Sequence, residues 1–286
     1  MSAPVAILGA GTQGRRLAYM WSSRGRPVHL VDENLSQLQD AQKAVEQFRK
    51  TDSKSEYLSG ELKTFTSEDL RAALQEAWLV VECVPELLPL KRAVIENIDA
   101  LTGPMTIIAS NSSSFTITEI VAGLELRYPD RFVSLHSYWP PETPAIEIMA
   151  SPKTKPLIIQ RLISECKDHG FSPYHVKKNS TGYIYNRIWA AIKREALSVA
   201  AEGVATPEEI DAIYKDVLKT PKGPFEQMDV VGLDVVLDIE EHYAQERTGL
   251  PETPRELLRK MVAEGKLGVK SRQGFYTYDS EGRIEK

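Results

Sequence analysis

The chain has 286 residues, with 35 basic and 40 acidic side chains and a formal net charge of −5. Neither sign forms a long run, which argues against nucleic acid as a partner. The apolar start is short, so we expect no signal peptide and no membrane span there. Cys83 and Cys166 lack ligand-type spacing, which predicts reduced thiols, no metal site and a cytoplasmic location.

The first part of the chain has the pattern of a strand, a turn and a helix, followed by a second strand and helix. The predicted elements are a strand at Pro4–Leu8, a helix at Thr12–Arg24, a strand at Pro27–Asp32 and a helix from Leu35 to about Arg49. Their order and length match a βαβ unit. The glycines after Leu8 stand where such a unit turns from strand to helix.

Further apolar runs predict strands that continue this sheet. They lie at Trp78–Val84, Met105–Ser110, Arg131–His136, Ala145–Met149 and Ser172–Lys178, with a helix near Pro156–His169. Strands that alternate with helices indicate a parallel, doubly wound sheet. We therefore expect an α/β domain in residues 1–179.

The pattern changes to helices alone in the last third of the chain. A long run of helix formers extends over Tyr183–Gly203, and Thr206 followed by Pro207 is a strong helix start. Two more helical patterns follow, at residues 232–246 and 253–265. The sequence therefore predicts an all-helical C-terminal domain over residues 180–286.

The stretch "ILGAGTQG" has the glycine spacing of a dinucleotide-binding turn. Gly9 permits the tight turn, Gly11 lets a pyrophosphate approach the backbone, and Gly14 lets the helix pack close to the strand. The phosphates would meet the helix N-terminus. The cofactor-binding candidates are Gly9, Gly11, Thr12, Gln13, Gly14 and Asp32. This predicts a Rossmann-type domain; the alternatives are a turn without a ligand and a bound FAD.

Asp32 decides which nucleotide is expected. It stands at the end of the second strand, about twenty residues after the glycines, where a carboxylate accepts hydrogen bonds from ribose hydroxyls. A carboxylate there repels a 2′-phosphate, so NAD is favoured over NADP. Arg15 and Arg16 temper this preference, but both lie inside the helix.

His136 is the candidate acid and base. Dinucleotide enzymes carry chemistry at the carboxyl ends of sheet strands, and the sequence predicts that His136 ends its strand. Histidine titrates nearest neutral pH, and Glu147 in the next apolar segment could hold its other ring nitrogen. Glu142 is closer, but its neighbouring prolines predict a loop. The alternative is a hydrogen-bonded core histidine with a surface glutamate.

The chain resembles the NAD-dependent L-3-hydroxyacyl-CoA dehydrogenases and the related lambda-crystallin and gulonate enzymes. The motifs that carry the resemblance are "ILGAGTQG", "VVECVPE", "ASNSSSFTITEI", the strand into His136, "GYIYNRI", "TPKGPFEQMDVVGLD" and "LGVKSRQGFYTY". The resemblance implies that His136 is the acid and base with Glu147 as its partner. It also implies that Ser113 and Asn186 bind the reacting oxygen. Glu86 and Lys91 match positions near the nicotinamide ribose.

The resemblance also bears on assembly and on the substrate. It implies a homodimer built by the helical domain, with Gly223, Pro224 and Phe225 matching dimer-forming helices. Three departures stand out: Trp139 replaces the family's asparagine, Glu147 falls one residue closer to the histidine, and the CoA-gripping segment after Asp32 is short. Only Lys50, Lys54 and Lys63 remain there as cations. Tyr138, Trp139 and Trp189, with Ser113 and Asn186, are candidate substrate-pocket residues.

These observations predict an NAD-dependent oxidoreductase that interconverts a 3-hydroxyacyl compound and its 3-keto form. One alternative keeps this redox step but assigns a CoA-free hydroxy or keto metabolite, such as a sugar acid or a carnitine-like compound. Another is a non-catalytic, crystallin-like protein that binds NAD. The expected partner is a small molecule.

Overall fold

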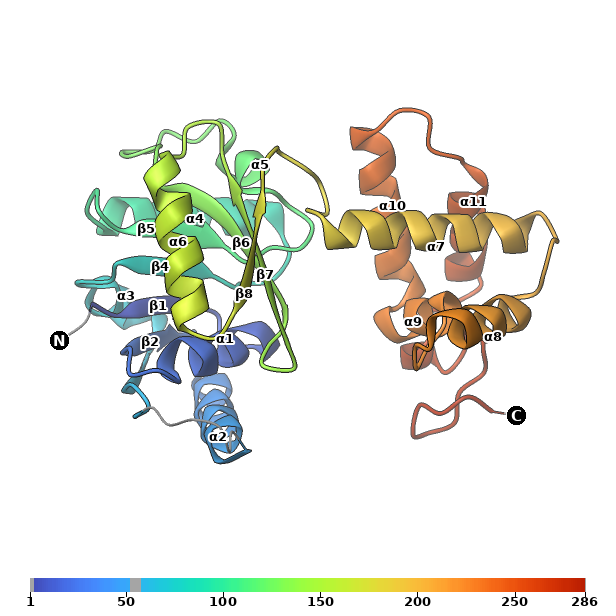
Figure 1. Cartoon of the computed structure of the whole chain (residues 1–286), viewed down its shortest axis with the longest axis horizontal. Coiled ribbons are helices and arrows are strands. Elements are labelled where there is room, and N and C mark those ends of the chain that lie inside the picture. The colour runs from blue at the N-terminus through green and yellow to red at the C-terminus, as the bar shows by residue number, and fades with distance from the viewer. Residues whose placement is uncertain (1–2, 52–57, 286) are drawn as a thin grey trace. The chain divides into compact units, whose positions relative to one another are not determined.

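The computed structural model describes residues 3–51 and 58–285, so Lys54 lies outside the described residues. The chain divides into two compact units, Met1–Tyr183 and Ile184–Lys286 (Figure 1). The boundary expected after residue 179 lies in the segment that follows the last strand of the first unit. Among the described helices, none combines the length and the apolar composition that crossing a membrane requires.

The first unit is built on an eight-stranded sheet in the order β3-β2-β1-β4-β5-β6-β7-β8. Its strands are β1 (Val5–Leu8), β2 (Val28–Val31), β3 (Leu62–Phe65), β4 (Leu79–Glu82), β5 (Ile107–Ser110), β6 (Phe132–Trp139), β7 (Thr143–Ala150) and β8 (Ser172–Val176). The neighbours from β2 to β6 pair in parallel, as the sequence predicts. β3, which the sequence patterns did not indicate, pairs in parallel with β2. β7 follows β6 through a turn too short for a crossover, so it is antiparallel to β6, and β8 is parallel to β7.

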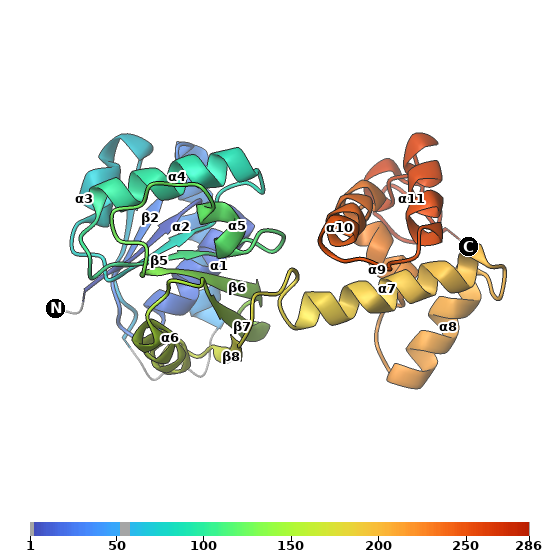
Figure 2. The same ribbon diagram turned by 90° about the horizontal axis from the view of Figure 1, so that it is seen from above.

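Helices cover both faces of this sheet (Figures 1 and 2). One face carries α1 (Thr12–Ser22), α2 (Leu35–Thr51) and α6 (Pro156–Asp168); the other carries α3 (Leu70–Leu74), α4 (Leu88–Leu101) and α5 (Ile117–Val121). Successive residues of β1 alternate between the two hydrophobic cores: Val5 and Ile7 pack in one, Ala6 in the other. The predicted doubly wound α/β architecture is confirmed.

The second unit consists of helices around their own core. They are α7 (Tyr185–Ala201), α8 (Pro207–Leu218), α9 (Pro224–Val231), α10 (Leu233–Glu246) and α11 (Thr253–Ala263). Thr206 starts α8 as predicted, because its hydroxyl accepts a hydrogen bond from the Glu209 backbone N–H and the Glu209 carboxylate accepts one from the Thr206 N–H. The sequence patterns did not indicate α9, which is eight residues long.

The segment that contains Gly223 and Phe225 packs within the chain. Phe225 is fully buried in the core of the second unit, and its backbone N–H donates to Asp211 of α8 at 2.9 Å. A Cβ at Gly223 would lie 2.4 Å from the Asp211 carboxyl carbon. These residues therefore join α9 to α8 within one chain. This packing does not test the expected contact with a second chain.

The turn from β1 to α1 uses its three glycines in two different ways. Gly9 has φ +103°, and a Cβ added there would lie 2.5 Å from the Cys83 carbonyl oxygen. A Cβ added at Gly14 would lie 1.7 Å from the Gly9 carbonyl oxygen. At both positions the neighbouring backbone leaves no room for a side chain, whether or not a ligand binds. At Gly11 an added Cβ meets nothing within 4 Å. The fold therefore requires Gly9 and Gly14 but leaves open space at Gly11.

The substitutions Gly14→Ala and Gly11→Ala should consequently separate in stability. Gly14→Ala forces backbone apart and should lower the free energy of unfolding by about 3 kcal/mol or more, since overpacking alone costs 1–3 kcal/mol. Gly11→Ala should change it by about 1 kcal/mol or less, because only the helix cap is affected. Urea denaturation of both variants measures the difference, and equal stabilities would contradict this account of the turn.

Candidate functional site

The N-terminal end of α1 has the features of a site for dinucleotide phosphates. Within α1, which the structure describes completely, no side chain caps the first turn and no acidic residue lies in it. Its backbone N–H groups therefore point toward the open space at Gly11. Asp32 accepts hydrogen bonds from the backbone N–H groups of Ala10 (2.7 Å) and Asn34 (2.9 Å), which holds its carboxylate beside the turn. These residues fit a dinucleotide with unmodified ribose hydroxyls.

Arg16 of α1 is engaged by the turn between β6 and β7. Its guanidinium donates to the Pro140 carbonyl at 2.6 Å and pairs with Glu142 at 2.5 Å. It also lies 4.2 Å from the centroid of the Trp139 ring. A guanidinium held by a carboxylate and an indole is not available to a 2′-phosphate, which agrees with the preference that Asp32 indicates.

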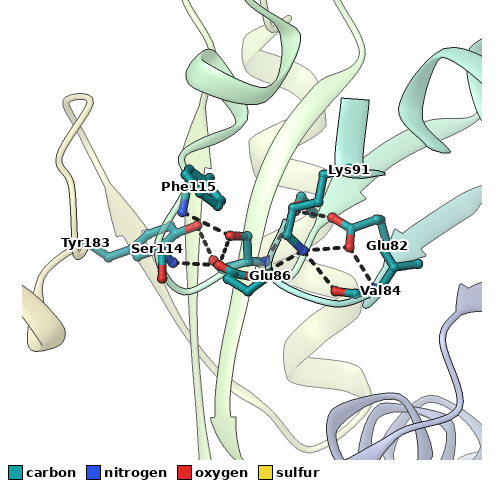
Figure 3. Close-up of polar contacts among 9 residues, drawn as sticks. Glu82, Val84, Glu86, Lys91, Ser114, Phe115 and Tyr183 are labelled. Atoms are coloured by element: carbon teal, nitrogen blue, oxygen red, sulfur yellow. Dashed lines mark hydrogen bonds and ion pairs between the residues drawn. The ribbon is translucent and has the colours of Figure 1, made fainter. Parts of the chain in front are cut away.

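A buried polar network follows β4 (Figure 3). Glu82, at the end of β4, accepts hydrogen bonds from Lys91 Nζ (2.8 Å), Ser110 Oγ (2.6 Å) and the Val84 N–H (2.8 Å). Lys91 also pairs with Glu86 at 3.1 Å. Burial opposes the charge of Lys91, but the two carboxylates outweigh burial and raise its pKa. Lys91 therefore stays charged and holds both glutamates in place.

Glu86 connects this network to the serine loop after β5 (Figure 3). Its carboxylate accepts hydrogen bonds from the Ser112 hydroxyl and, at 2.9 Å, from the Ser114 N–H. Burial works to raise the pKa of Glu86, but the Lys91 charge and these donors lower it overall. Ser113, between the two, is exposed. Ser112 therefore has a structural partner, whereas Ser113 is exposed to solvent.

His136 lies within β6, and the expectation that it ends its strand is wrong. β6 continues to Trp139 because the antiparallel strand β7 supplies partners beyond the parallel part of the sheet, pairing Trp139 with Thr143. Glu142 is in the turn between the two strands, as its prolines predicted. The hairpin thus extends past His136.

Two tyrosines enclose the imidazole of His136, which is only 5% exposed. The Tyr183 ring stacks on it, with ring centroids 4.8 Å apart and planes inclined by 12°. The Tyr138 ring meets it edge-on, with centroids 4.7 Å apart. Burial lowers the pKa of His136 to about 4 against the opposing effect of Glu86. The imidazole is therefore neutral at neutral pH and able to accept a proton.

Glu147 lies directly opposite His136 in the β6–β7 ladder, so that both side chains share one face of the sheet. The Tyr138 hydroxyl donates a hydrogen bond to the Glu147 carboxylate. The Nδ1 atom of His136 is buried and has no hydrogen-bond partner among the described residues. The hairpin thus brings together the predicted pair and adds a phenol that the sequence did not reveal.

Asn186 and Trp189 belong to the second unit. Both lie near the start of α7 and are half-buried. Their spacing of three residues puts them on the same side of this helix. Their contact with a substrate stays a prediction.

Sequence reasoning missed three residues of this site. Glu82 had a signal, because a charge within an apolar strand needs a buried partner, and Lys91 in the next helix is that partner. Ser112 was not distinguished from its neighbouring serines. Tyr183 had no local signal: it reaches the site through a backbone with φ +56° and a hydrogen bond from its hydroxyl to the Ser112 carbonyl at 2.8 Å.

The chain is similar to characterised dehydrogenases over nearly its whole length. It is 32% identical to the human mitochondrial hydroxyacyl-coenzyme A dehydrogenase, over 96% of this chain and 90% of that protein. It is 30% identical to 5-formyl-3-hydroxy-2-methylpyridine 4-carboxylate 5-dehydrogenase from Mesorhizobium japonicum, over 97% and 91%. The crystal structure of (S)-3-hydroxybutyryl-CoA dehydrogenase from Ralstonia eutropha matches with a TM-score of 0.85 and 33% identity, over 98% of this chain and all (100%) of that one.

Two family models match the two parts of the chain in succession. The model of the 3-hydroxyacyl-CoA dehydrogenase NAD binding domain matches residues 4–180, and that of the C-terminal domain matches residues 182–278. The first contains the glycine turn, Asp32 and the His136 hairpin, and the second contains α7 to α11. The chain therefore belongs to the 3-hydroxyacyl-CoA dehydrogenase family and is an NAD-dependent oxidoreductase of that kind.

Proposed function

We propose that this enzyme interconverts a 3-hydroxyacyl substrate and its 3-keto form, with His136 as the general acid and base. The observation that carries the proposal is the neutral, enclosed imidazole opposite Glu147. When bound, NAD supplies the acceptor for the hydride. His136 accepts the hydroxyl proton as the hydride leaves, and in the reverse direction it returns that proton to the carbonyl oxygen.

The residues around the N-terminal end of α1 each have one task in binding NAD. The residues at the pyrophosphate are Gly9, Gly11, Thr12, Gln13 and Gly14. Asp32 binds the adenosine ribose, and Glu86 lies near the nicotinamide ribose. Lys91 is 1% exposed and already pairs with Glu82 and Glu86, so its task is to hold Glu86 in its ionised form.

Exposed and half-buried polar side chains contact the substrate in this proposal. Ser113 and Asn186 donate hydrogen bonds to the reacting oxygen, and Glu147 stabilises the imidazolium that forms on His136. Tyr138, Trp139 and Trp189 supply aromatic surface to the rest of the substrate. Trp139 is 47% exposed, which supports a contact with a ligand.

The substitution His136→Gln tests the catalytic role. It should lower kcat by roughly 10²–10⁴-fold, because the proton then has no acceptor. NADH affinity, measured by fluorescence titration, should remain near that of the unchanged enzyme. In the unchanged enzyme, kcat/KM for oxidation should stay level in mild acid and fall only near the His136 pKa of about 4, because only the neutral ring accepts a proton. Retained turnover in the variant would remove His136 from the mechanism.

A substrate without CoA is the second candidate, and one observation favours it. The sequence between α2 and β3 consists of residues 52–61, and the resemblance to acyl-CoA enzymes implies a longer, CoA-gripping segment there. Lys50 and Lys63 are two cations that flank this connection. The relative from Mesorhizobium japonicum, by its name, acts on a pyridine carboxylate. A small hydroxy or keto acid would need no such segment.

Acetoacetyl-CoA and acetoacetate, each offered with NADH, separate the two candidates. If CoA is part of the natural substrate, kcat/KM for the thioester should exceed that for the acid by about tenfold or more, since each 1.4 kcal/mol of binding gives that factor. The opposite ranking would support the CoA-free substrate. Equal values would also count against the CoA candidate, because a bound CoA must contribute to recognition.

We further propose that the enzyme is a homodimer joined through its helical unit. Helices α8, α9 and α10 carry a set of apolar side chains that are at least 41% exposed: Ile213, Val217, Val230, Val231 and Val235. Ile213 and Val217 are four residues apart and share one side of α8. Large exposed apolar side chains are typical of surfaces that contact another protein.

Sedimentation analysis should give twice the chain mass of 32.0 kDa. Charged substitutions at Ile213 and Val217 (I213E and V217E together) should yield single chains, because burying two carboxylates in an apolar contact is costly. Met105→Glu, at a site that is 80% exposed in the first unit, is the matched control and should leave the mass unchanged. A single-chain mass for the unchanged protein would contradict the dimer.

A further inference from the structure

We propose that Tyr138 is a positioning residue whose hydroxyl holds the Glu147 carboxylate and so limits how strongly that carboxylate stabilises protonated His136. This rests on the proposed function, in which His136 moves the proton. In that function Tyr138 is only a wall of the substrate pocket. The inference adds that it controls the protonation of the base.

Tyr138 is fixed at both ends. It follows His136 by two residues in β6, so the two side chains project from the same face of the strand. Its carbonyl accepts a hydrogen bond from Gln13 Nε2 at 2.7 Å, which ties this part of the hairpin to α1. At the other end its hydroxyl donates to Glu147 Oε1. The pairing register shifts between Ser137 and Trp139, and this irregularity lies at Tyr138.

Tyr138 and His136 compete for the same carboxylate. Glu147 lies opposite His136, yet its Oε1 atom accepts a hydrogen bond from the Tyr138 phenol, and the buried Nδ1 of His136 has no partner among the described residues. A hydrogen bond from a hydroxyl to a carboxylate is among the stronger kinds, so it reduces what the carboxylate offers to a second donor. The low pKa of His136, which burial brings to about 4, agrees with this weak support.

The other charged groups near His136 in the first unit come from separate elements. Glu86, after β4, favours protonation of His136, and its carboxylate is paired with the charge of Lys91. Glu119 of α5 acts electrostatically on Tyr183. Tyr183 stays neutral, because burial raises the pKa of its hydroxyl. Deletion of the Tyr138 hydroxyl removes its bond to Glu147 and leaves the Glu82–Lys91 ion pair in place.

The consequence for catalysis is a base that remains neutral over a wide pH range. Oxidation of the hydroxyl compound needs the neutral imidazole, whereas reduction of the keto compound needs the imidazolium. A hydroxyl that restrains Glu147 therefore favours the oxidation-ready form at neutral pH. Its removal should favour the form that is ready for reduction.

The test is the pKa of His136 itself, followed by NMR in protein labelled on its five histidines. His136→Gln identifies the resonance. In Tyr138→Phe the pKa should rise by about one to two units, the equivalent of one hydrogen bond to a charged group. Tyr183→Phe is the matched control: it removes the other phenol against the same imidazole, and the shift should be clearly smaller. An equal or absent shift in Tyr138→Phe would overturn the proposal.

A double-mutant cycle with Glu147→Gln shows whether Tyr138 acts through the carboxylate. Tyr138→Phe should have no further effect on the His136 pKa when Glu147 is already Gln; a persistent rise would overturn the proposal. Glu147→Gln alone, in a protein that keeps Tyr138, should lower the pKa of His136 by less than about one unit. A larger fall would mean that the carboxylate supports the imidazolium despite the phenol, which also overturns it.

These measurements do not depend on turnover, so the inference and the proposed function fail separately. If the proposed function is wrong and the inference right, His136→Gln will retain turnover, while Tyr138→Phe will still raise the pKa of His136. Failure of the inference would appear as an unchanged pKa in Tyr138→Phe while His136 remains essential. In the kinetics, Tyr138→Phe should move the acid limb of kcat/KM for oxidation upward by the same one to two units.

Discussion

The buried ion pair between Glu82 and Lys91 is the constraint on which the candidate site depends. Glu82 is 0% and Lys91 1% exposed, so neither charge has water as a partner. Loss of one partner would leave the other buried and unpaired, at a cost of about 3–5 kcal/mol. The Ser110 hydroxyl and the Val84 N–H occupy further positions on Glu82. The pair therefore fixes the loops that follow β4 and β5 together.

From this pair a continuous set of contacts leads to Tyr183 (Figure 3) and through its ring to the imidazole of His136. Lys91 pairs with Glu86, Glu86 accepts from Ser112, and the Ser112 carbonyl accepts from Tyr183, whose ring stacks on His136. The bonds from Ser112 to Glu86 and from Tyr183 to Ser112 each join segments that follow different strands. The orientation of the base thus depends on groups far from it in the sequence, and on their all being satisfied at once.

The residues proposed for cofactor binding and proton transfer stand on different parts of the fold from those proposed to contact the substrate. The nucleotide turn and the base stand on buried strands, where packing limits their movement. Trp139 and Ser113 are exposed on a hairpin and a loop, and Asn186 lies on a helix of the second unit. In the proposed function, a change at Trp139 alters the surface offered to the substrate and leaves the nucleotide turn and His136 in place. A chain can therefore share the family's redox chemistry and differ in what it oxidises.

The sequence by itself determined the local features. The glycine spacing, Asp32 after the second strand, the alternating apolar strands and the start of α8 at Thr206 all depend on residues close in the chain. Only the tertiary structure decided that β6 continues past His136, that Tyr138 reaches Glu147 and that Tyr183 stacks on the imidazole. These depend on strand register and on contacts between distant segments, which residue patterns do not encode, because a side chain's partner across a sheet is set by the pairing of the strands.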